Sequence, residues 1–350
     1  MENRHTTMFT KNQTFAIYME SNLDSDYGKM GFGVMRYAQQ PIVCVIDSNF
    51  AGQTVREAVG EPFDFPVVSS VEEAKQMGGE ILVLGIAPSG GKFPDEWDAP
   101  METALNLGMS LINGLHDDLN ARFGHLIKFP NQKIWDVRKP APVPQIAQAR
   151  AAELNNKRVL MVGTDMAAGK MTAGLEIYKW IKAQGISTDF LATGQIGITV
   201  TGKGIPLDAI KVDKACGAVE DLVLSAKDKD IVFIEGQGSL LHPGSTATLP
   251  LMRGSCATHM ILCHRGDMTT LRRATKVQIP PLKDFIKLNE AVAGCCGALT
   301  PAKVIGIALN TSKMTEENAI AMIEKLEAET GLPVTDVIRF GAEKLGKPLL

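Results

Sequence analysis

The sequence has few cysteines, no long hydrophobic run and no excess of positive charge. Its six cysteines show neither C-x-x-C spacing nor the pattern of a small secreted framework, so we expect reduced, buried thiols. No apolar run reaches membrane-spanning length, and residues Met1 to Glu20 contain no hydrophobic signal core. We therefore expect a cytoplasmic protein with no membrane partner.

The charge balance also excludes a class of partner. With 36 basic and 39 acidic residues the net charge is −3, whereas a protein that grips a nucleic-acid backbone needs a basic face. Isolated basic groups remain available for a small anion, so we expect small-molecule substrates and no nucleic acid. A length of 350 residues exceeds a typical single domain and favours two.

A phosphate-binding loop is predicted between an apolar strand and an amphipathic helix. Gly163 is followed by five residues, then by Gly169, Lys170 and, one residue later, Thr172. This is close to G-x-x-x-x-G-K-[ST], with one residue too many before the second glycine and one between lysine and threonine. The alternative is a turn that only joins strand to helix. The loop residues expected to hold phosphate are Gly163, Thr164, Asp165, Met166, Ala167, Ala168, Gly169, Lys170, Met171 and Thr172.

Apolar runs separated by helical stretches predict an α/β protein with parallel βαβ units. In the first half, strands are expected at 41–47, 65–68, 80–86 and 108–113, with a helix start at Ser70 and a helix over 97–107. In the second half, strands are expected at 187–192, 230–235, 258–263 and 303–310, with helices over 145–154, 172–183 and from Thr315.

A proline-rich stretch, Val137 to Pro144, has the composition of a domain linker. We therefore predict an N-terminal Rossmann-like domain over 1–137, a linker with a leading helix over 138–157, and a P-loop-type parallel-sheet domain over 158–350.

Polar residues follow several predicted strands of the second half. Glu235 ends an apolar strand beside the phosphate loop, where an acid can orient magnesium, a water or a substrate, and Gly236 to Ser239 then exposes backbone donors. His264, Arg265 and Asp267 follow another strand, with Arg272 and Arg273 further on. These arginines could clamp a carboxylate or form a solvated helix face.

Other candidates are left open. Gln195, in a glycine-containing turn, could donate an amide hydrogen bond. His242 lies in a turn, where a histidine is more often structural than catalytic. Asn310 could contact a base or cap its turn. The vicinal Cys295-Cys296 pair favours a tight corner over metal or redox chemistry. Ser89-Gly90-Gly91-Lys92 could hold an anion or form a solvated turn.

The second half, from Gly163-Thr-Asp-Met-Ala-Ala-Gly-Lys170 through Glu235-Gly-Gln-Gly-Ser239 to Asn310, resembles the P-loop branch that includes dethiobiotin synthetase. The whole chain, with Thr193-Gly-Gln-Ile-Gly197, Glu235-Gly-Gln-Gly-Ser-Leu-Leu-His-Pro243 and Cys263-His-Arg-Gly-Asp267, more closely resembles the D-glutamate N-acetyltransferase family. That resemblance implies transfer of acetyl from acetyl-CoA to the amine of D-glutamate, ahead of racemisation by a partner enzyme.

Under this resemblance, each candidate residue is given a role. The loop from Gly163 to Thr172, with Asn310, would bind CoA. The general base would be Glu235 first, then His264, with Asp165 and Asp267 behind them. Acceptor binding is expected from Gln195, Gln237, Ser239, His242, Arg265 and Arg272.

Two alternatives to acetyl transfer stay open. One is an ATP- and magnesium-dependent ligase or kinase, and the other is a nucleotide- or CoA-binding protein without activity. Met171 stands where a hydroxyl usually ligates magnesium, so no metal is expected. Association into a homo-oligomer is left open.

Overall fold

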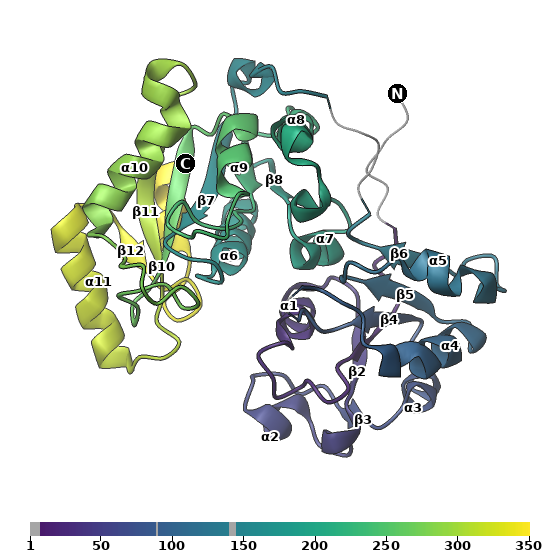
Figure 1. Cartoon of the computed structure of the whole chain (residues 1–350). Helices are drawn as coiled ribbons and strands as arrows, with labels where there is room; N and C mark the ends of the chain where they lie inside the picture. Colours follow the sequence, from purple (N-terminus) through teal and green to yellow (C-terminus); the bar gives the residue numbers. More distant parts are fainter. Residues whose placement is uncertain (1–7, 89, 140–144) are drawn as a thin grey trace. The chain divides into compact units, whose positions relative to one another are not determined.

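The computed structural model describes residues 8–88, 90–139 and 145–350. Ser89 of the predicted anion loop and residues 140–144 of the predicted linker lie outside the described residues. The chain divides into two compact units. The first comprises Met1–Ala141 and Gln195–Ala209, and the second comprises Pro142–Gly194 and Ile210–Leu350. Figure 1 shows both units, each built around a sheet with flanking helices.

The first unit contains a six-stranded parallel sheet in the order β3-β2-β1-β4-β5-β6. This is the strand order of a Rossmann fold, so the predicted Rossmann-like domain is confirmed. The strand between Gly108 and Asn113 is shorter than predicted and begins at Ser110. The strands are β1 (Phe15–Tyr18), β2 (Ile42–Ile46), β3 (Val67–Val68), β4 (Ile81–Leu84), β5 (Ser110–Asn113) and β6 (Ile134–Asp136).

Strands β1 and β6 and the helix after β1 were not predicted from the sequence. Their identity as strands comes from pairing with β2, β4 and β5. Ser70 caps its helix as predicted, accepting from the backbone N–H of Glu73 at 3.2 Å. The helices are α1 (Lys29–Tyr37), α2 (Val55–Val59), α3 (Val71–Gln76), α4 (Asp98–Asn106), α5 (Leu119–Phe123) and α7 (Gln195–Thr201), with 3-10 turns η1 (Ser48–Phe50), η2 (Asp95–Trp97), η3 (Gly124–Leu126) and η5 (Leu207–Ala209).

The loop between β1 and α1 differs from a dinucleotide-binding loop. It carries Glu20, Asp24 and Asp26 in place of a glycine-rich phosphate cradle. Asp47, at the end of β2, is fully buried and accepts backbone N–H groups of Leu23 at 3.0 Å and Asn22 at 3.3 Å. In dinucleotide-binding folds an acid near this position binds a ribose. Here the carboxylate of Asp47 instead holds the loop between β1 and α1 through these hydrogen bonds.

The segment Gln195–Ala209 belongs to the first unit although it lies within the predicted P-loop domain. The run from Thr193 to Ile198 was interpreted as a loop, but residues from Gln195 onward form α7, which packs on α1. A Cβ placed on Gly33 would lie only 2.5 Å from Cγ2 of Ile196. An ion pair between Arg138 and Asp208 ties the far end of the segment to the same unit. The second domain was predicted to be continuous over 158–350, whereas in the structure residues 195–209 interrupt it.

The second unit contains a second six-stranded parallel sheet, in the order β12-β11-β10-β7-β9-β8. The predicted parallel-sheet architecture of this half is confirmed. Strand β7, which leads into the phosphate loop, lies between β9 and β10. The strands are β7 (Lys157–Gly163), β8 (Thr188–Leu191), β9 (Ile231–Ile234), β10 (His259–Arg265), β11 (Lys303–Asn310) and β12 (Val334–Thr335).

One predicted helix of this unit is wrong, and one of the two alternatives left open for Arg272 and Arg273 is excluded. Residues 145–154 contain only the 3-10 turn η4, because the buried carboxylate of Glu220 accepts the backbone N–H of Arg150 at 2.7 Å and that of Gln148 at 3.1 Å. Arg272 and Arg273 lie in a loop and not on a helix. The helices are η4 (Arg150–Glu153), α6 (Lys170–Ala183), α8 (Val212–Leu224), α9 (Thr248–Ser255), α10 (Leu282–Gly294), η6 (Cys295–Gly297), α11 (Glu316–Thr330), α12 (Glu343–Gly346) and η7 (Lys347–Leu349).

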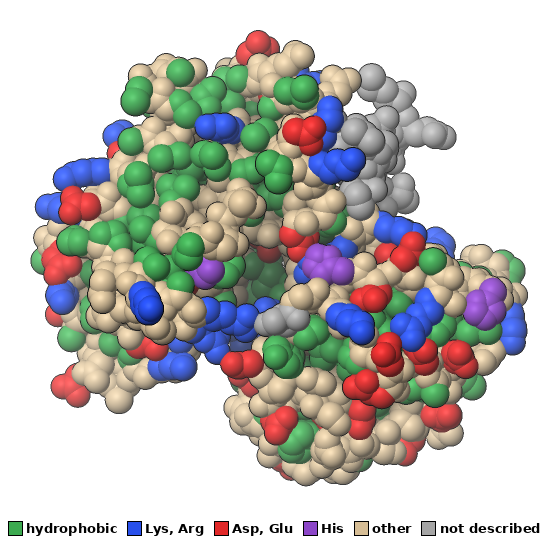
Figure 2. All heavy atoms as spheres, viewed as in Figure 1, with side chains coloured by type: hydrophobic (Ala, Val, Ile, Leu, Met, Phe, Trp, Pro, Cys, Tyr) green, Lys and Arg blue, Asp and Glu red, His purple; other side chains and the backbone are tan. Residues whose placement is uncertain are grey.

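The surface fits the balanced composition. On the face drawn in Figure 2, acidic and basic side chains are interspersed with apolar ones. None of the helices in the described ranges is both long enough and apolar enough to cross a membrane.

Candidate active site

The phosphate loop joins β7 to α6 at the carboxyl edge of the second sheet. Strand β7 ends at Gly163 and α6 begins at Lys170, so the predicted strand, loop and helix are present in this order. Two loop residues have left-handed backbones, Ala167 at φ 54° and Gly169 at φ 100°. These turns bring the chain back to the start of a 14-residue helix, whose N-terminal N–H groups and dipole favour an anion.

Lys170 lies beneath this loop and is almost completely buried. Its ammonium donates to the backbone carbonyl of Asp165 at 2.8 Å. Burial lowers the pKa of Lys170 because the charged form is desolvated, while nearby Cys263, Asp165 and Glu235 oppose the shift. A phosphate at the loop would add negative charge that favours the ammonium form of Lys170.

Two glycines leave room for the side chain of Lys170. Gly163 is the last residue of β7, and Gly236 follows β9. A Cβ on Gly236 would lie 1.6 Å from the carbonyl oxygen of Met161 and 2.9 Å from Cδ of Lys170. A Cβ on Gly163 would lie 3.2 Å from Nζ of Lys170. The lysine side chain therefore fits between two glycine backbones, which fixes its position.

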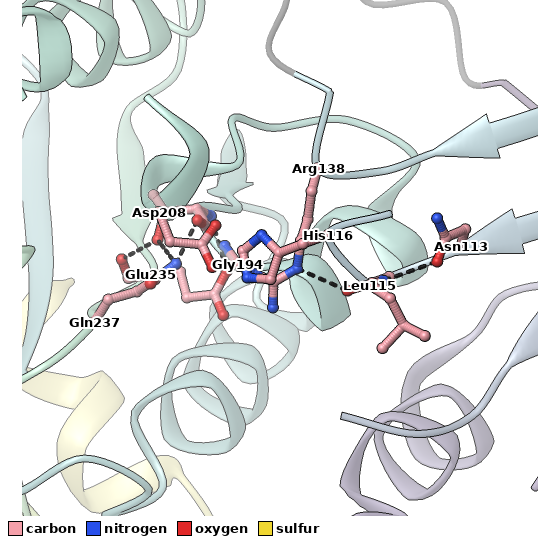
Figure 3. A network of polar contacts seen from close by, with 10 residues as sticks. Asn113, Leu115, His116, Arg138, Gly194, Asp208, Glu235 and Gln237 are labelled. Atoms are coloured by element: carbon pink, nitrogen blue, oxygen red, sulfur yellow. Dashed lines mark hydrogen bonds and ion pairs between the residues drawn. The ribbon is translucent and has the colours of Figure 1, made fainter. Parts of the chain in front are cut away.

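Glu235 follows β9 and is buried next to the phosphate loop. Its Oε2 accepts the backbone N–H groups of Thr193 at 2.8 Å and Gly194 at 3.0 Å (Figure 3). Burial raises its pKa to about 7, against the lowering effect of these hydrogen bonds and of Lys170. Glu235 is thus a carboxyl group that can exchange a proton near neutral pH.

The residues after Glu235 form a tightly hydrogen-bonded loop. The side-chain amide of Gln237 donates to the backbone carbonyl of Thr193. The backbone carbonyl of Gln237 accepts the hydroxyl of Thr248 at 2.9 Å. Ser239 donates its hydroxyl to the carbonyl of Thr164 in the phosphate loop at 3.0 Å. The loops after β7, β8 and β9 are therefore joined to one another through specific side chains.

His242 lies in the turn that continues this loop. Its Nδ1 accepts the backbone N–H of Gly244 at 3.1 Å, so the proton of the neutral ring is on Nε2. That Nε2 is buried and has no hydrogen-bond partner among the described residues. A buried donor without a partner is costly, which favours a ligand group there.

His264 lies at the end of β10 on the other side of β7. Its Nδ1 is 3.0 Å from the hydroxyl of Thr164, and burial lowers its pKa to about 4 despite the nearby carboxylate of Asp267. The ring is therefore neutral at physiological pH. The preceding Cys263 is fully buried, which raises its pKa to about 12 and makes it a poor nucleophile.

Arg265, Asp267 and Arg272 line one cavity of about 220 Å³ at the carboxyl end of β10. Nε of Arg265 is 3.3 Å from Oδ1 of Asp267. Burial acts to raise the pKa of Asp267, but the hydrogen bond and the charge of Arg265 outweigh it and lower the pKa. Asp267 is therefore held as an anion in an ion pair.

Asp165 fastens the phosphate loop to this cavity. Its Oδ1 accepts the backbone N–H of Met166 at 2.7 Å, and its Oδ2 accepts the backbone N–H of Arg272 at 2.8 Å. Both oxygens are engaged, so the geometry favours a positioning role over that of a base.

The remaining loop candidates frame the site. Asn310 ends β11 in register with Arg265, and its Nδ2 lies 3.8 Å from the point where a Cβ of Gly169 would be. Its Oδ1 accepts the backbone N–H of Ser312 at 3.1 Å. Met171 and Thr172 lie in the first turn of α6.

The structure brings most of the predicted residues to one sheet edge, but not all. Gln195 begins α7 and is grouped with the first unit. Thr193 and Gly194, which bind Glu235, and Lys313, which lines the cavity, were missed as site residues. Lys313 was detectable in principle, because it comes three residues after Asn310 and neighbouring parallel strands end at the same edge.

A second polar cluster lies in the first unit. Arg138 donates from Nε to the carbonyl of Gly114 at 2.7 Å, and its Nη1 is 3.1 Å from Nε2 of His116 (Figure 3). Burial and the charge of Arg138 lower the pKa of His116. In the described part of the chain, no group of three or more histidine, cysteine or carboxylate side chains could hold a metal ion.

Two family models match the two halves of the sequence. A domain of unknown function, DUF1611_C, described as a P-loop domain, matches residues 145–346. A second, DUF1611_N, described as a Rossmann-like domain, matches residues 48–140.

Proteins and structures similar to the whole chain are also known. A protein of Tritonibacter scottomollicae named D-glutamate N-acetyltransferase is 36% identical over 279 residues, covering 79% of this chain and 83% of that protein. A protein of Pseudoalteromonas sp. with the same name is 33% identical over 307 residues, covering 87% of this chain and 89% of that protein. A crystal structure of a DUF1611 family protein from Anabaena variabilis superposes with a TM-score of 0.92 at 48% identity, over 97% of this chain and 99% of that one.

Both halves match their domain models in order, and the named relatives match over most of their length. The chain therefore belongs to the D-glutamate N-acetyltransferase family, with the Rossmann-like and P-loop domains described as DUF1611.

Proposed function

We propose that this protein transfers the acetyl group of acetyl-CoA to the amine of D-glutamate by direct attack. The names of the two relatives support the reaction class. The observation that carries the proposal is Glu235, a buried carboxyl group with a pKa raised to about 7, next to a phosphate loop. A base with a pKa near the working pH is effective in proton transfer.

The donor would bind through its diphosphate. The backbone N–H groups between Gly163 and Thr172 and the ammonium of Lys170 would contact the diphosphate oxygens. The long, flexible pantetheine arm would then carry the thioester toward the side of the loop where β8 and β9 end. Coenzyme A suits such a loop as well as ATP does, because both contain a 5′-diphosphate group.

Glu235 would take the proton that the amine must lose. Its Oε2 is held by Thr193 and Gly194, and no hydrogen bond to Oε1 comes from the described residues, so Oε1 is the acceptor atom. The amine lone pair forms a bond to the thioester carbon, the C–S bond breaks, and CoA leaves as the thiolate. Backbone N–H groups of Gly236 to Gly238 would stabilise the developing oxyanion.

The acceptor would lie on the same side. The Nε2–H of His242 is a donor suited to a carboxylate oxygen, and its missing partner supports this role. The chemistry needs no acetyl-enzyme, which agrees with the buried, protonated thiol of Cys263.

The test is a thiol-release assay with acetyl-CoA and a panel of D- and L-amino acids, with and without ATP and magnesium. We expect CoA release that depends on D-glutamate and is unchanged by ATP and magnesium. Turnover that requires ATP and magnesium and forms phosphate or ADP would instead support a ligase or kinase.

A further inference from the structure

The cavity at the carboxyl end of β10 has the size of a subsite. At about 220 Å³ it lies below the usual range of whole-ligand pockets, about 300–1,000 Å³, so it suits one group of a larger ligand. It is formed by the loop after β10 together with one residue from the loop after β11. The lining residues are Arg265, Asp267, Met268, Thr269, Thr270, Leu271, Arg272, Thr275 and Lys313.

The charges around this cavity select an anion. Arg265, Arg272 and Lys313 are the cationic residues of the lining, and Asp267 is its one carboxylate residue. That carboxylate is already paired with Arg265. Three threonines, Thr269, Thr270 and Thr275, also belong to the lining, and threonine hydroxyl groups can donate to an oxyanion.

The cavity is attached to the phosphate loop. The backbone N–H of Arg272, in the cavity wall, is 2.8 Å from Oδ2 of Asp165 in that loop. Arg265 is in register with Asn310, whose amide lies next to Gly169. A ligand whose diphosphate occupies the loop would thus have a neighbouring anionic group within reach of the cavity.

The cavity and Glu235 lie on opposite sides of β7. The sheet order places β9, which leads to Glu235, on one side of β7 and β10, which leads to the cavity, on the other. In acetyl-CoA the thioester and the ribose lie on opposite sides of the diphosphate, and the ribose carries a 3′-phosphate. A donor whose thioester lies on the Glu235 side of β7 can therefore place its ribose on the cavity side.

We propose that the cavity lined by Arg265, Arg272 and Lys313 binds the ribose 3′-phosphate of the CoA donor and not a carboxylate of the acceptor. This assignment rests on the proposed function and differs from the expectation from sequence that Arg265 and Arg272 clamp the acceptor. A phosphate dianion offers more charge and more acceptor atoms to three cations than one carboxylate does.

The test compares CoA with 3′-dephospho-CoA by titration calorimetry, which reads binding whether or not acetyl transfer occurs. We expect the full-length protein to bind CoA about tenfold or more tightly than the dephospho analogue, as one charge-assisted contact would give. In Lys313→Gln this ratio should fall toward one because only CoA loses affinity, whereas Lys313→Arg should keep most of it. Lys325→Gln, an exposed lysine on α11, is the matched control and should leave the ratio unchanged.

Two results would overturn the assignment. One is equal affinity for the two ligands in the unaltered protein, or no binding of either. The other is a rise in the KM for D-glutamate in Lys313→Gln with an unchanged ratio of donor affinities, because this would place the acceptor in the cavity. A preference for CoA that depends on Lys313, without any acetyl transfer, would support the subsite while refuting the proposed reaction.

Discussion

Glu235 and Lys170 are buried ionisable residues whose environment favours the neutral form of each. The pKa of the carboxyl group is raised and that of the ammonium group is lowered, in both cases first by burial. Oppositely directed shifts at neighbouring groups are typical of sites that move protons or bind charged ligands.

Replacing Glu235 by Gln should remove the base while keeping the shape of the side chain. We expect kcat to fall by about 10²- to 10⁴-fold, the usual contribution of a general base, with little change in the KM for acetyl-CoA. The measurement is CoA release at saturating D-glutamate. The matched control is Glu329→Gln, an exposed glutamate on α11, which should retain full activity. Full activity in Glu235→Gln would exclude Glu235 as the base.

The pH dependence of kcat/KM should identify which group acts as base. The ionised carboxylate is the active form, so activity should rise with pH and level off above the pKa of Glu235, about 7. If His264 were the base, the rise would instead occur near its pKa of about 4. Measuring kcat/KM by thiol release across the pH range from 4 to 7 distinguishes the two candidates. A profile that is flat across pH 7 would count against Glu235.

Lys170→Ala should weaken donor binding far more than folding. Loss of a charge-assisted contact should raise the Kd for acetyl-CoA by about 10- to 100-fold. Stability should fall less than donor affinity, because burial of the lysine already disfavours its charged form in the folded protein and this offsets part of the packing that is lost. Calorimetry gives the Kd and thermal unfolding gives the Tm. Lys182→Ala, exposed on the same helix, should change neither, and an equal loss of both in Lys170→Ala would indicate a folding role.

At the level of elements, the loop between β7 and α6 depends on one left-handed glycine. Gly169 has φ 100°, and among the described residues outside its own helix and chain neighbours, Nδ2 of Asn310, at 3.8 Å, is the one heavy atom within 4 Å of its Cβ position. A side chain would therefore fit sterically but would strain the backbone. The function of this element lies in its backbone path, which sets the direction of the N–H groups.

Gly169→Ala should lower both stability and donor affinity. The left-handed backbone costs an L-residue about 1–2 kcal/mol, and relief of this strain would turn the loop N–H groups away from the donor. Gly185→Ala provides the control, because Gly185 has φ 81°, has open space around it, and follows the other end of α6. We expect similar losses in Tm for the two variants but a raised Kd only for Gly169→Ala. Equal Kd values would show that the loop conformation does not matter for binding.

The strands show which elements a sequence reveals. Strand β11 was predicted with its observed ends, because its apolar run is long and is bounded by polar residues. Strands β1 and β6 were missed although β4 and β9, which have the same length as β1, were predicted, so it is pairing with β2, β4 and β5 that identifies them. Helix α7 was mistaken for a loop because its glycine and threonine residues have low helix propensity, and packing on α1 overrides this.

At the level of the whole molecule, the chain leaves the first unit after the Rossmann-like sheet and returns to it once. Residues Gln195–Ala209 interrupt the P-loop unit and complete the first unit through α7 and the ion pair of Asp208 with Arg138. The two units are therefore joined by more than one crossing of the chain. A boundary placed from composition alone cannot show this.

Ile196→Ala should destabilise the first unit, although position 196 lies within the matched P-loop domain. Ile196 packs against the glycine backbone of α1, so its truncation should cost about 1–2 kcal/mol at this half-buried position. Hydrogen exchange measured by mass spectrometry should show faster exchange in peptides of β1, β4 and α1. Ile186→Ala, a half-buried isoleucine of the second unit, should instead affect peptides of β8. Faster exchange only in the second unit for Ile196→Ala would contradict the division.

The sequence by itself determined the class of fold, the phosphate loop and the residues most suited to chemistry. Apolar periodicity marks strands and helices, and glycines followed by a lysine mark a loop that can approach phosphate, so these features are local in the chain. The resemblance to the D-glutamate N-acetyltransferase family also followed from sequence motifs, and the similarity to named relatives confirms it.

Only the tertiary structure decided what each polar group can do. Burial raises the pKa of Glu235 and makes it a candidate base. Both carboxylate oxygens of Asp165 accept hydrogen bonds from backbone N–H groups. Because β10 and β11 end side by side, Lys313 and Arg265 line the same cavity. Desolvation and pairing depend on residues far apart in the chain, and a linear sequence does not contain their distances. The same long-range packing assigns Gln195–Ala209 to the first unit.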